Sequence, residues 1–209
     1  MPAKRSNTST PSRPRHPWEA AKAWVQELGY RAASSKGRIG KGSFGTVYPA
    51  EYTDGCIYAV KFSQAVIPMQ LEREAQALAA LQSHPHPNVL PTIAFCAFEG
   101  LKMVQISPCA VDDLHTWLDK RVVEPSVAHV LAQGACAGVA HLHGCKILHR
   151  DIKPGNMLIF VTPYLHLKLS DFGTVRPVPE SGESLTPSVA SLLQSQIFLQ
   201  HFTAKFFVQ

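Results

Sequence analysis

A run of polar side chains in the second half of the sequence has the residue types and the spacing that phosphoryl transfer requires. The run is His149-Arg150-Asp151-Ile152-Lys153-Pro154-Gly155-Asn156. It supplies a carboxylate that can accept a hydroxyl proton (Asp151), an ammonium that can neutralise transferring phosphate (Lys153) and an amide oxygen for a metal ion (Asn156). Asp171-Phe172-Gly173 follows 15 residues after Asn156 and adds a carboxylate suited to Mg²⁺. Together, these residues predict a metal-assisted site for phosphate chemistry.

A glycine-rich segment earlier in the chain, Gly40-Lys41-Gly42-Ser43-Phe44-Gly45, can bring backbone N–H groups close to phosphate oxygens. By itself the pattern also fits a plain hairpin or the fingerprint of a dinucleotide-binding fold. Residues 46–48 (TVY) continue as a strand, and no crossover helix follows. This order disfavours the dinucleotide fold, and with it a metabolic enzyme that uses a dinucleotide.

Lys61 lies on an apolar strand, Tyr58-Ala59-Val60-Lys61, 16 residues after Gly45. An isolated strand lysine is more often exposed, but a buried ammonium needs an anionic partner such as phosphate or a carboxylate. Glu74 is the expected carboxylate, because Leu78 and Leu81 follow it on the apolar face of a predicted helix. Glu72 on the same helix is expected to be solvated.

The periodicity of the sequence predicts strands first and helices later, which indicates an α+β arrangement with two lobes and not βαβ winding. Expected strands are 36–39, 46–51, 58–62, 92–97, 102–106, 157–160 and 165–169. Expected helices are 70–82, 111–120, 125–143 and a helical stretch within 18–35, whose run Gly29 stops.

These motifs, in this order, resemble the eukaryotic protein kinase family from about Ile39 to Ser188. The residues that carry the resemblance are Gly40, Gly42, Gly45, Val47, Ala59, Lys61, Glu74, the His84–Val89 stretch, His149–Asn156 and Asp171–Gly173. The resemblance implies a two-lobed kinase fold, with an antiparallel sheet and one helix in the N-lobe and a mainly helical, incomplete C-lobe. It divides the chain into a disordered basic tail (1–17), a helical extension (18–35), an N-lobe (36–106), a partial C-lobe (107–188) and a non-matching apolar tail (189–209).

The same resemblance implies a role for each site residue. Catalytic roles fall to Asp151, Lys153, Lys61 and Glu74, with Lys61 on the α- and β-phosphates of ATP and paired with Glu74. Mg²⁺ is expected on Asn156 and Asp171. The implied nucleotide-binding residues are Ile39, Gly40, Lys41, Gly42, Ser43, Phe44, Gly45, Val47, Ala59, Lys61, Ile106 as gatekeeper, and Ser107 and Cys109 in the hinge.

Lys153 and the Leu185–Ser188 segment resemble serine/threonine kinases, although dual-specificity kinases share the lysine. The implied function is transfer of the ATP γ-phosphate to a serine or threonine hydroxyl of a protein. No Ala-Pro-Glu motif follows Ser188, and we expect a C-terminal truncation. The alternative is therefore a non-catalytic nucleotide-binding or interaction module. The apolar tail (189–209) is either unrelated sequence or a helix that covers exposed apolar surface.

Composition narrows the remaining possibilities. The net charge of +5 comes largely from the acid-free stretch 1–17, so charge does not predict a nucleic-acid partner. The five cysteines are odd in number and lack C-x-x-C spacing, which favours a reducing compartment. The sequence shows neither a membrane span nor a secretory signal. We expect an intracellular, cytoplasmic protein whose regulatory partner the sequence does not identify.

Overall fold

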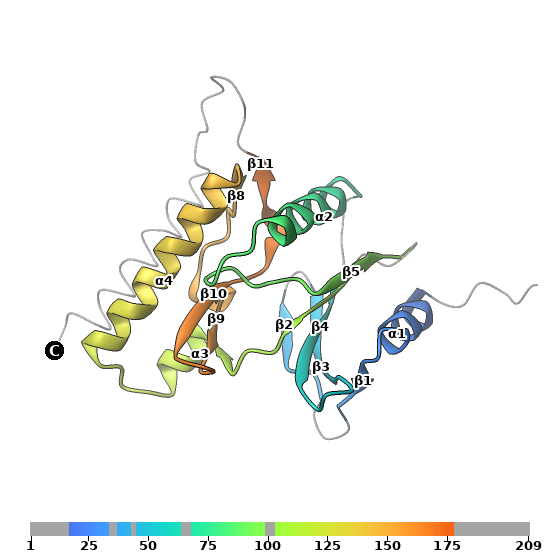
Figure 1. The fold of residues 1–209 in the computed structure, drawn as a ribbon, viewed down its shortest axis with the longest axis horizontal. Coiled ribbons are helices and arrows are strands. Elements are labelled where there is room, and N and C mark those ends of the chain that lie inside the picture. The colour runs from blue at the N-terminus through green and yellow to red at the C-terminus, as the bar shows by residue number, and fades with distance from the viewer. Residues whose placement is uncertain (1–16, 34–36, 43–44, 64–67, 99–102, 178–209) are drawn as a thin grey trace, which may run out of the picture.

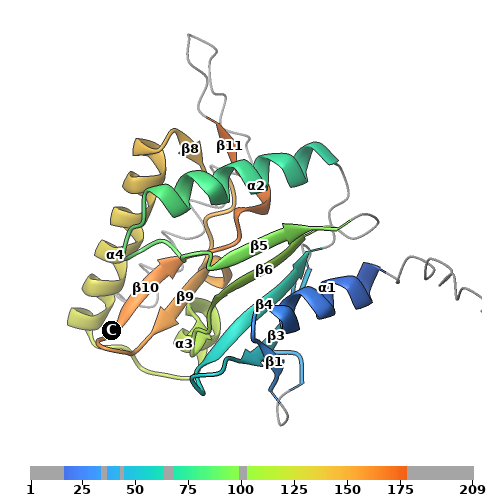
Figure 2. The ribbon, with the colours of Figure 1, turned by 45° about the vertical axis from the view of Figure 1, so that its right-hand side comes forward.

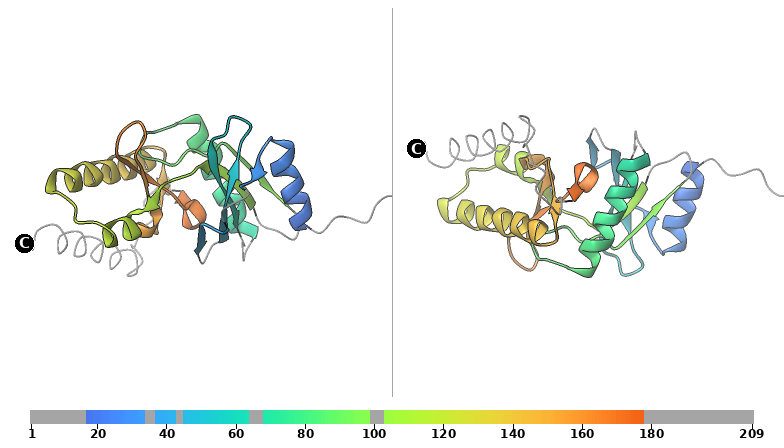
Figure 3. Two further views of the ribbon diagram at one scale, coloured as in Figure 1. Left: turned by 90° about the horizontal axis from the view of Figure 1, so that it is seen from below. Right: turned by 90° about the horizontal axis from the view of Figure 1, so that it is seen from above.

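The computed structural model describes residues 17–33, 37–42, 45–63, 68–98 and 103–177. Within these ranges the chain folds into two lobes, each with its own sheet (Figures 1 and 3). No helix among the described residues is both long enough and apolar enough to cross a membrane. Residues 1–16, Ser43, Phe44 and residues 178–209, on which several of the predictions fall, lie outside the described residues.

The N-lobe is built on one antiparallel sheet with the order β1-β3-β4-β6-β5, in which β2 also pairs with β3. Its strands are β1 (Arg31–Ala32), β2 (Gly40–Gly42), β3 (Gly45–Glu51), β4 (Ile57–Ser63), β5 (Ala94–Ala97) and β6 (Met103–Pro108). β-Branched and aromatic residues at alternate positions of β4 explain its central place, since they pack well on a pleated surface. The expected strands over 46–51, 58–62, 92–97 and 102–106 correspond to β3, β4, β5 and β6. The expected strand over 36–39 is wrong, because residues 37–39 form no strand and β2 begins only at Gly40.

Two helices cover opposite faces of this sheet (Figures 1 and 2). α1 (Pro17–Glu27) packs Ala21 and Val25 against Val60 and Ile106. α2 (Pro68–Ser83) packs Leu78 and other apolar residues on the opposite side, in the core shared with the C-lobe. Each helix thus buries one apolar face of the sheet.

The helix expected in the 18–35 stretch stops near Gly29, as predicted, and the described residues that follow it are not helical. α1 ends at Glu27, and Gly29 then adopts φ +89°, a left-handed conformation that costs glycine little. The chain reverses there and enters β1, which pairs with β3. The helical extension is therefore one helix and one short strand of the sheet.

The described part of the C-lobe consists of helices, short strands and 3₁₀ turns. The helices are α3 (Leu114–Asp119) and α4 (Pro125–Gly144), and the 3₁₀ turns are η1 (Pro154–Asn156) and η2 (Phe172–Thr174). The strands are β7 (Asp112–Asp113), β8 (Ile147–Leu148), β9 (Met157–Phe160), β10 (His166–Leu169) and β11 (Arg176–Pro177). They form a sheet of order β10-β9-β7 and a separate β11-β8 pair.

Local sequence explains where the two C-lobe helices begin. The Asp113 side chain accepts a hydrogen bond from the backbone N–H of Thr116 at 2.9 Å, and this cap starts α3. Asp112 and Asp113 are therefore strand and cap, and the expected helix over 111–120 begins only at Leu114. Pro125 stands in the first turn of α4, where its fixed φ suits a helix and no N–H is needed.

Candidate active site

The segment between β8 and β9 holds the first group of expected site residues in one compact loop. His149 is 3% exposed; its Nε2 lies 2.9 Å from the carbonyl oxygen of Ser170, and its Nδ1 accepts the backbone N–H of Asp151 at 3.3 Å. Burial lowers the pKa of His149, so the ring is neutral with its hydrogen on Nε2. Arg150 has φ +69°, a sparsely populated conformation that concentrates at functional sites.

Asp151 is the centre of this loop and is only 6% exposed. Its Oδ2 accepts hydrogen bonds from Lys153 Nζ at 2.6 Å and from Asn156 Nδ2 at 2.8 Å. Asn156 Nδ2 also donates to the backbone oxygen of Asp151 at 2.8 Å. The structure therefore brings the three predicted residues together, with the carboxylate oriented by two donors.

Asp171 lies at the start of η2, beside the first loop. Ser170, the residue before it, donates both its backbone N–H and its hydroxyl to the carbonyl oxygen of Asn156, at 2.9 and 3.0 Å. Phe172 is buried and packs on the His149 ring with centroids 5.6 Å apart. Asp171 itself has φ +65°. These contacts join the two expected metal-binding residues into one site and give Ser170 a positioning role that the sequence did not indicate.

Asn156 and Asp171 have the donor set that Mg²⁺ needs. Both bonds of the Asn156 Nδ2 group go to Asp151, so its oxygen is the end left for a cation. Asp171 uses Oδ1 for an ion pair with Lys61, which leaves its second oxygen. Mg²⁺ is usually held by one or two carboxylates together with water and substrate phosphate, so two protein ligands suffice. Among the described residues, no group of three or more His, Cys, Asp or Glu side chains forms a ready metal cage.

The expected ion pair between Lys61 and Glu74 is absent among the described residues. Lys61 Nζ instead lies 2.6 Å from Asp171 Oδ1. Glu74 is 7% exposed, and its Oε1 has no hydrogen-bond partner in the described part of the chain. Burial raises the pKa of Glu74, the Lys61 charge lowers it and the Asp171 charge raises it. Lys61 has two candidate carboxylates and pairs with the nearer one.

The glycine-rich segment forms the β2–β3 hairpin, with Gly40 opposite Val47 and Gly42 opposite Gly45. A Cβ at Gly45 would lie 2.3 Å from the carbonyl oxygen of Phe62 on β4, so only glycine fits there. Ile39 and Lys41 are exposed beside this hairpin. The structure therefore places the hairpin next to the strand that carries Lys61.

Ile106 does not lie on the face of Lys61, which corrects its assignment as gatekeeper. Strand register places Gln105 opposite Lys61, and Ile106 opposite Val60. Because side chains alternate between the two faces of a sheet, Ile106 points into the core beneath α1. Gln105 is the residue that the sequence interpretation missed, and its buried amide donates to Thr92 Oγ1 at 2.8 Å.

Other expected nucleotide-binding residues do share the Lys61 face. Val47 pairs with Lys61, and Ala59 pairs with Ser107. Cys109 is half-buried just beyond β6. A polar residue within the apolar run of β6 was the signal that would have found Gln105.

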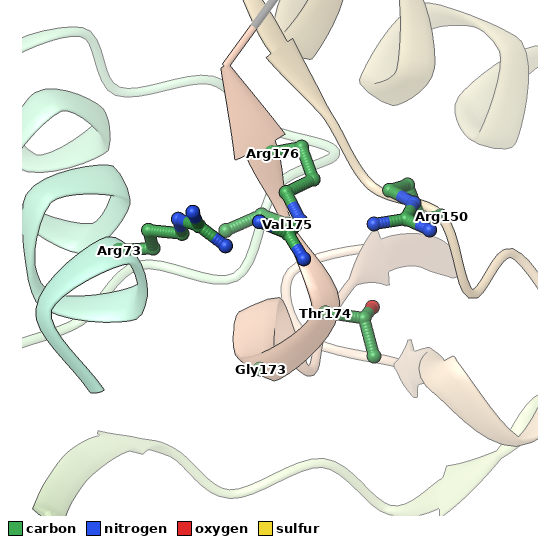
Figure 4. A pocket seen from close by; sticks show the side chains of 6 residues that line it. All are labelled: Arg73, Arg150, Gly173, Thr174, Val175 and Arg176. Atoms are coloured by element: carbon green, nitrogen blue, oxygen red, sulfur yellow. The ribbon is translucent and has the colours of Figure 1, made fainter. Parts of the chain in front are cut away.

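A small basic cavity of about 270 Å³ lies beside Arg150 and η2 (Figure 4). It is lined by Arg73 of α2, Arg150 and Arg176 of β11, together with residues of η2. Thr174 Oγ1 donates to the carbonyl oxygen of His149 at 2.8 Å and fixes one wall. Three guanidinium groups from separate elements make the cavity suited to a phosphate-like anion.

Comparison with known proteins supports the assignment from geometry. The model of the protein kinase domain matches residues 33–198, ten residues beyond Ser188. The chain therefore belongs to the protein kinase family.

Individual relatives agree. The chain is 36% identical over 147 residues to phytosulfokine receptor 1 of Arabidopsis thaliana, an overlap of 66% of this chain and 14% of that protein. It is 30% identical over 189 residues to the interferon-induced, double-stranded RNA-activated protein kinase of Mus musculus, an overlap of 78% of this chain and 35% of that protein. It is 30% identical over 141 residues to serine/threonine-protein kinase 10 of Mus musculus, covering 66% and 14%. The chain thus spans a minor part of the length of these relatives.

Proposed function

We propose that this chain binds ATP with Mg²⁺ and transfers the γ-phosphate to a serine or threonine hydroxyl of a protein substrate. The observation that supports this most strongly is the arrangement of Asp151, which is oriented by Lys153 and Asn156 and joined through Ser170 to Asp171. This arrangement places a proton acceptor, a cationic side chain and metal-binding oxygens in two adjacent loops, one after β8 and one after β10.

In the proposed reaction the substrate hydroxyl oxygen bonds to the γ-phosphorus while the bond from that phosphorus to the ADP oxygen breaks. Asp151 accepts the hydroxyl proton, and Lys153, 2.6 Å from that carboxylate, neutralises charge on the transferring phosphoryl group. Bound Mg²⁺ would neutralise the phosphate oxygens and orient them. Lys61 holds the α- and β-phosphates from β4, beneath the glycine hairpin.

The preference for serine and threonine is supported by Lys153 and by relatives named as serine/threonine-protein kinases. The proposed location is intracellular and cytoplasmic, supported by five free cysteine thiols, which fit a reducing compartment. Protein substrates follow from family membership, and no observation selects one.

One observation favours the alternative of a nucleotide-binding module without transfer activity. Within the described part of the chain, Oε1 of the buried Glu74 has no hydrogen-bond partner, and Lys61 pairs with Asp171 instead. In that case MgATP would bind, but phosphate would not be transferred.

Two measurements on the 209-residue chain test the proposal. Saturating MgATP at about 100 times its Kd is expected to stabilise the fold by about 2.7 kcal/mol, and less in Lys61→Met. Transfer of labelled γ-phosphate to a generic protein substrate is expected to fall by about 10²–10⁴-fold in Asp151→Asn. Stabilisation without transfer in the wild type would establish the non-catalytic module, and the absence of both would contradict the nucleotide site.

A further inference from the structure

The loop between α2 and β5 ties the N-lobe to the C-lobe through Asn88. Asn88 Nδ2 donates to the carbonyl oxygen of Leu167 at 2.8 Å. The backbone N–H of Leu169 donates to the backbone carbonyl oxygen of Asn88 at 2.9 Å. Glycines of helix α4 face this loop: a Cβ at Gly138 would lie 2.7 Å from the backbone carbonyl oxygen of Asn88. The loop backbone is therefore seated directly on α4, close to the end of the helix that carries Glu74 (Figure 2).

Two histidines reinforce this contact. The His86 ring of the loop stacks on the His141 ring of α4, with centroids 4.6 Å apart and planes 18° apart. His86 Nδ1 accepts the backbone N–H of Asn88 at 3.1 Å. His141 Nε2 lies 2.8 Å from the carbonyl oxygen of His84 and must donate to it, because a carbonyl oxygen only accepts. Both rings meet these contacts in their neutral forms.

The groups around the stacked His86 and His141 rings do little to stabilise a positive charge on either ring. Lys168 of β10 donates to the carbonyl oxygen of Pro87 at 2.5 Å, the Cys145 thiol lies 3.6 Å from His141 Nε2, and His84 belongs to the same loop. Among the described residues, neither ring forms an ion pair with a carboxylate. Burial, then His141 and Lys168, lower the pKa of His86.

We propose that His86 and His141 form a pH-sensitive clamp between the lobes, which holds the α2–β5 loop on α4 while both rings are neutral and releases it when His86 is protonated. A proton on His86 Nδ1 turns the acceptor of the Asn88 N–H into a donor. It also places a cation face to face with a second imidazole, near the Lys168 ammonium. Both changes weaken the packing of the α2–β5 loop on α4, and therefore the contact of α2 with the C-lobe through that loop.

The sign of the pH dependence follows from the lowered pKa. In the unfolded chain His86 titrates near its ordinary pKa of about 6.5. Between that value and the lower native pKa, the released or unfolded form binds more protons. Stability contributed by the clamp is therefore complete above about pH 6.5 and is lost as the pH falls toward the native pKa.

The first test follows the wild-type 209-residue chain by NMR from about pH 8 to about pH 5. We expect His86 to titrate below its ordinary pKa, and the Asn88 amide resonance to shift with the same midpoint. The protection of the Asn88 amide from hydrogen exchange, corrected for the intrinsic rate, should fall by about tenfold between about pH 7.5 and about pH 5.5. Titration of His86 at or above 6.5, or an Asn88 amide that does not respond, would overturn the proposal.

The second test uses His86→Asn, whose side-chain oxygen can still accept the Asn88 N–H but cannot gain a proton. The melting temperature of this variant should lose most of the fall that the wild type shows below about pH 6.5. His129→Asn, at an exposed position of α4, is the matched control and should keep the wild-type pH profile. Equal pH profiles for all three proteins would contradict the clamp; if His86→Asn fails to fold, the wild-type NMR titration decides.

Discussion

The ammonium of Lys61 lies 2.6 Å from the carboxylate of Asp171, whereas Glu74, the partner expected from the sequence, is buried and its Oε1 accepts no hydrogen bond from the described residues. Lys61 thus has two candidate carboxylates from different elements, and it forms its ion pair with the one next to η2. A bound metal ion at Asp171 would compete with Lys61 for that carboxylate. The lysine would then be available to phosphate and to Glu74.

The unpaired Glu74 makes its neutral amide replacement informative. A raised native pKa means that the folded state holds the proton more tightly than the unfolded state. Stability from this group is therefore complete below the unfolded pKa and is lost as the pH rises through the native pKa. Without nucleotide at neutral pH, Glu74→Gln is expected to raise the free energy of unfolding by about 1 kcal/mol.

Urea unfolding of the Glu74→Gln protein at neutral pH checks this expectation. Glu72→Gln is the matched control. Glu72 lies two residues before Glu74 on α2, on roughly the opposite face of the helix, and is exposed. The control should unfold like the wild type. A clear loss of stability in Glu74→Gln without nucleotide would show that the ionised carboxylate is satisfied after all.

Ile106 is expected to act on stability and not on nucleotide binding, because it is fully buried beneath α1. Ile106→Ala should cost about 2–4 kcal/mol in the free energy of unfolding through the cavity it leaves. The Kd for MgATP of the folded variant, measured by calorimetry below its melting temperature, should change by less than about threefold. A much weaker Kd with little loss of stability would restore Ile106 to the nucleotide site.

The glycines of α4 offer a test of how closely the loop at Asn88 approaches. Alanine is the better helix former by about 1 kcal/mol, so propensity alone predicts that Gly138→Ala stabilises the fold. The new Cβ would instead lie 2.7 Å from the backbone carbonyl oxygen of Asn88 and 2.9 Å from Leu169 Cδ1. We therefore expect the free energy of unfolding to fall by about 1–3 kcal/mol.

Gly144→Ala, near the end of the same helix, is the control. Among the described residues, apart from its chain neighbours and the backbone of α4 itself, no atom lies within 4 Å of a Cβ at that position. Thermal unfolding of both variants should therefore show opposite signs, with Gly144→Ala neutral or slightly stabilised. A stabilised Gly138→Ala would mean that the loop moves away from α4 at little cost.

The arginine-lined cavity predicts a response to phosphate on hydroxyl residues that follow Asp171-Phe172-Gly173 in the sequence. Four such residues are Thr174, Ser181, Ser184 and Thr186. The Thr174 hydroxyl donates to the His149 carbonyl oxygen, and the other three lie outside the described residues. Hydrogen bonds from Arg150 and Arg176 to a phosphate are worth about 1.5–3 kcal/mol each. Phosphatase treatment should therefore lower the melting temperature by about 6 °C or more, at about 2–4 °C per kcal/mol for a chain of this size.

Arg150→Gln should remove most of this difference between phosphorylated and dephosphorylated protein. Mass spectrometry before and after treatment establishes which residues carry phosphate. An active preparation without phosphate on any of these residues would sink the prediction. Lys120→Gln, on the exposed surface of the C-lobe, controls for a general loss of positive charge.

Much of this protein follows from its sequence alone. The spacing of His149–Asn156 and Asp171–Gly173 indicated the family, which the family match confirms, and the order of strands and helices indicated a two-lobed α+β fold, which the structure confirms. Such features are local: hydrophobic periodicity, caps and motif spacing depend on neighbours along the chain. The roles of the site residues stay proposals that the experiments above address.

Tertiary structure decided the features that depend on distant neighbours. Strand register turned Ile106 away from Lys61 and placed Gln105 there, because a shift of one residue exchanges the two faces of a strand. Competition between Asp171 and Glu74 for one ammonium depends on how α2 and η2 pack. The stacking of His86 on His141, 55 residues apart in sequence, likewise exists only because the loop and α4 are held together in the folded chain.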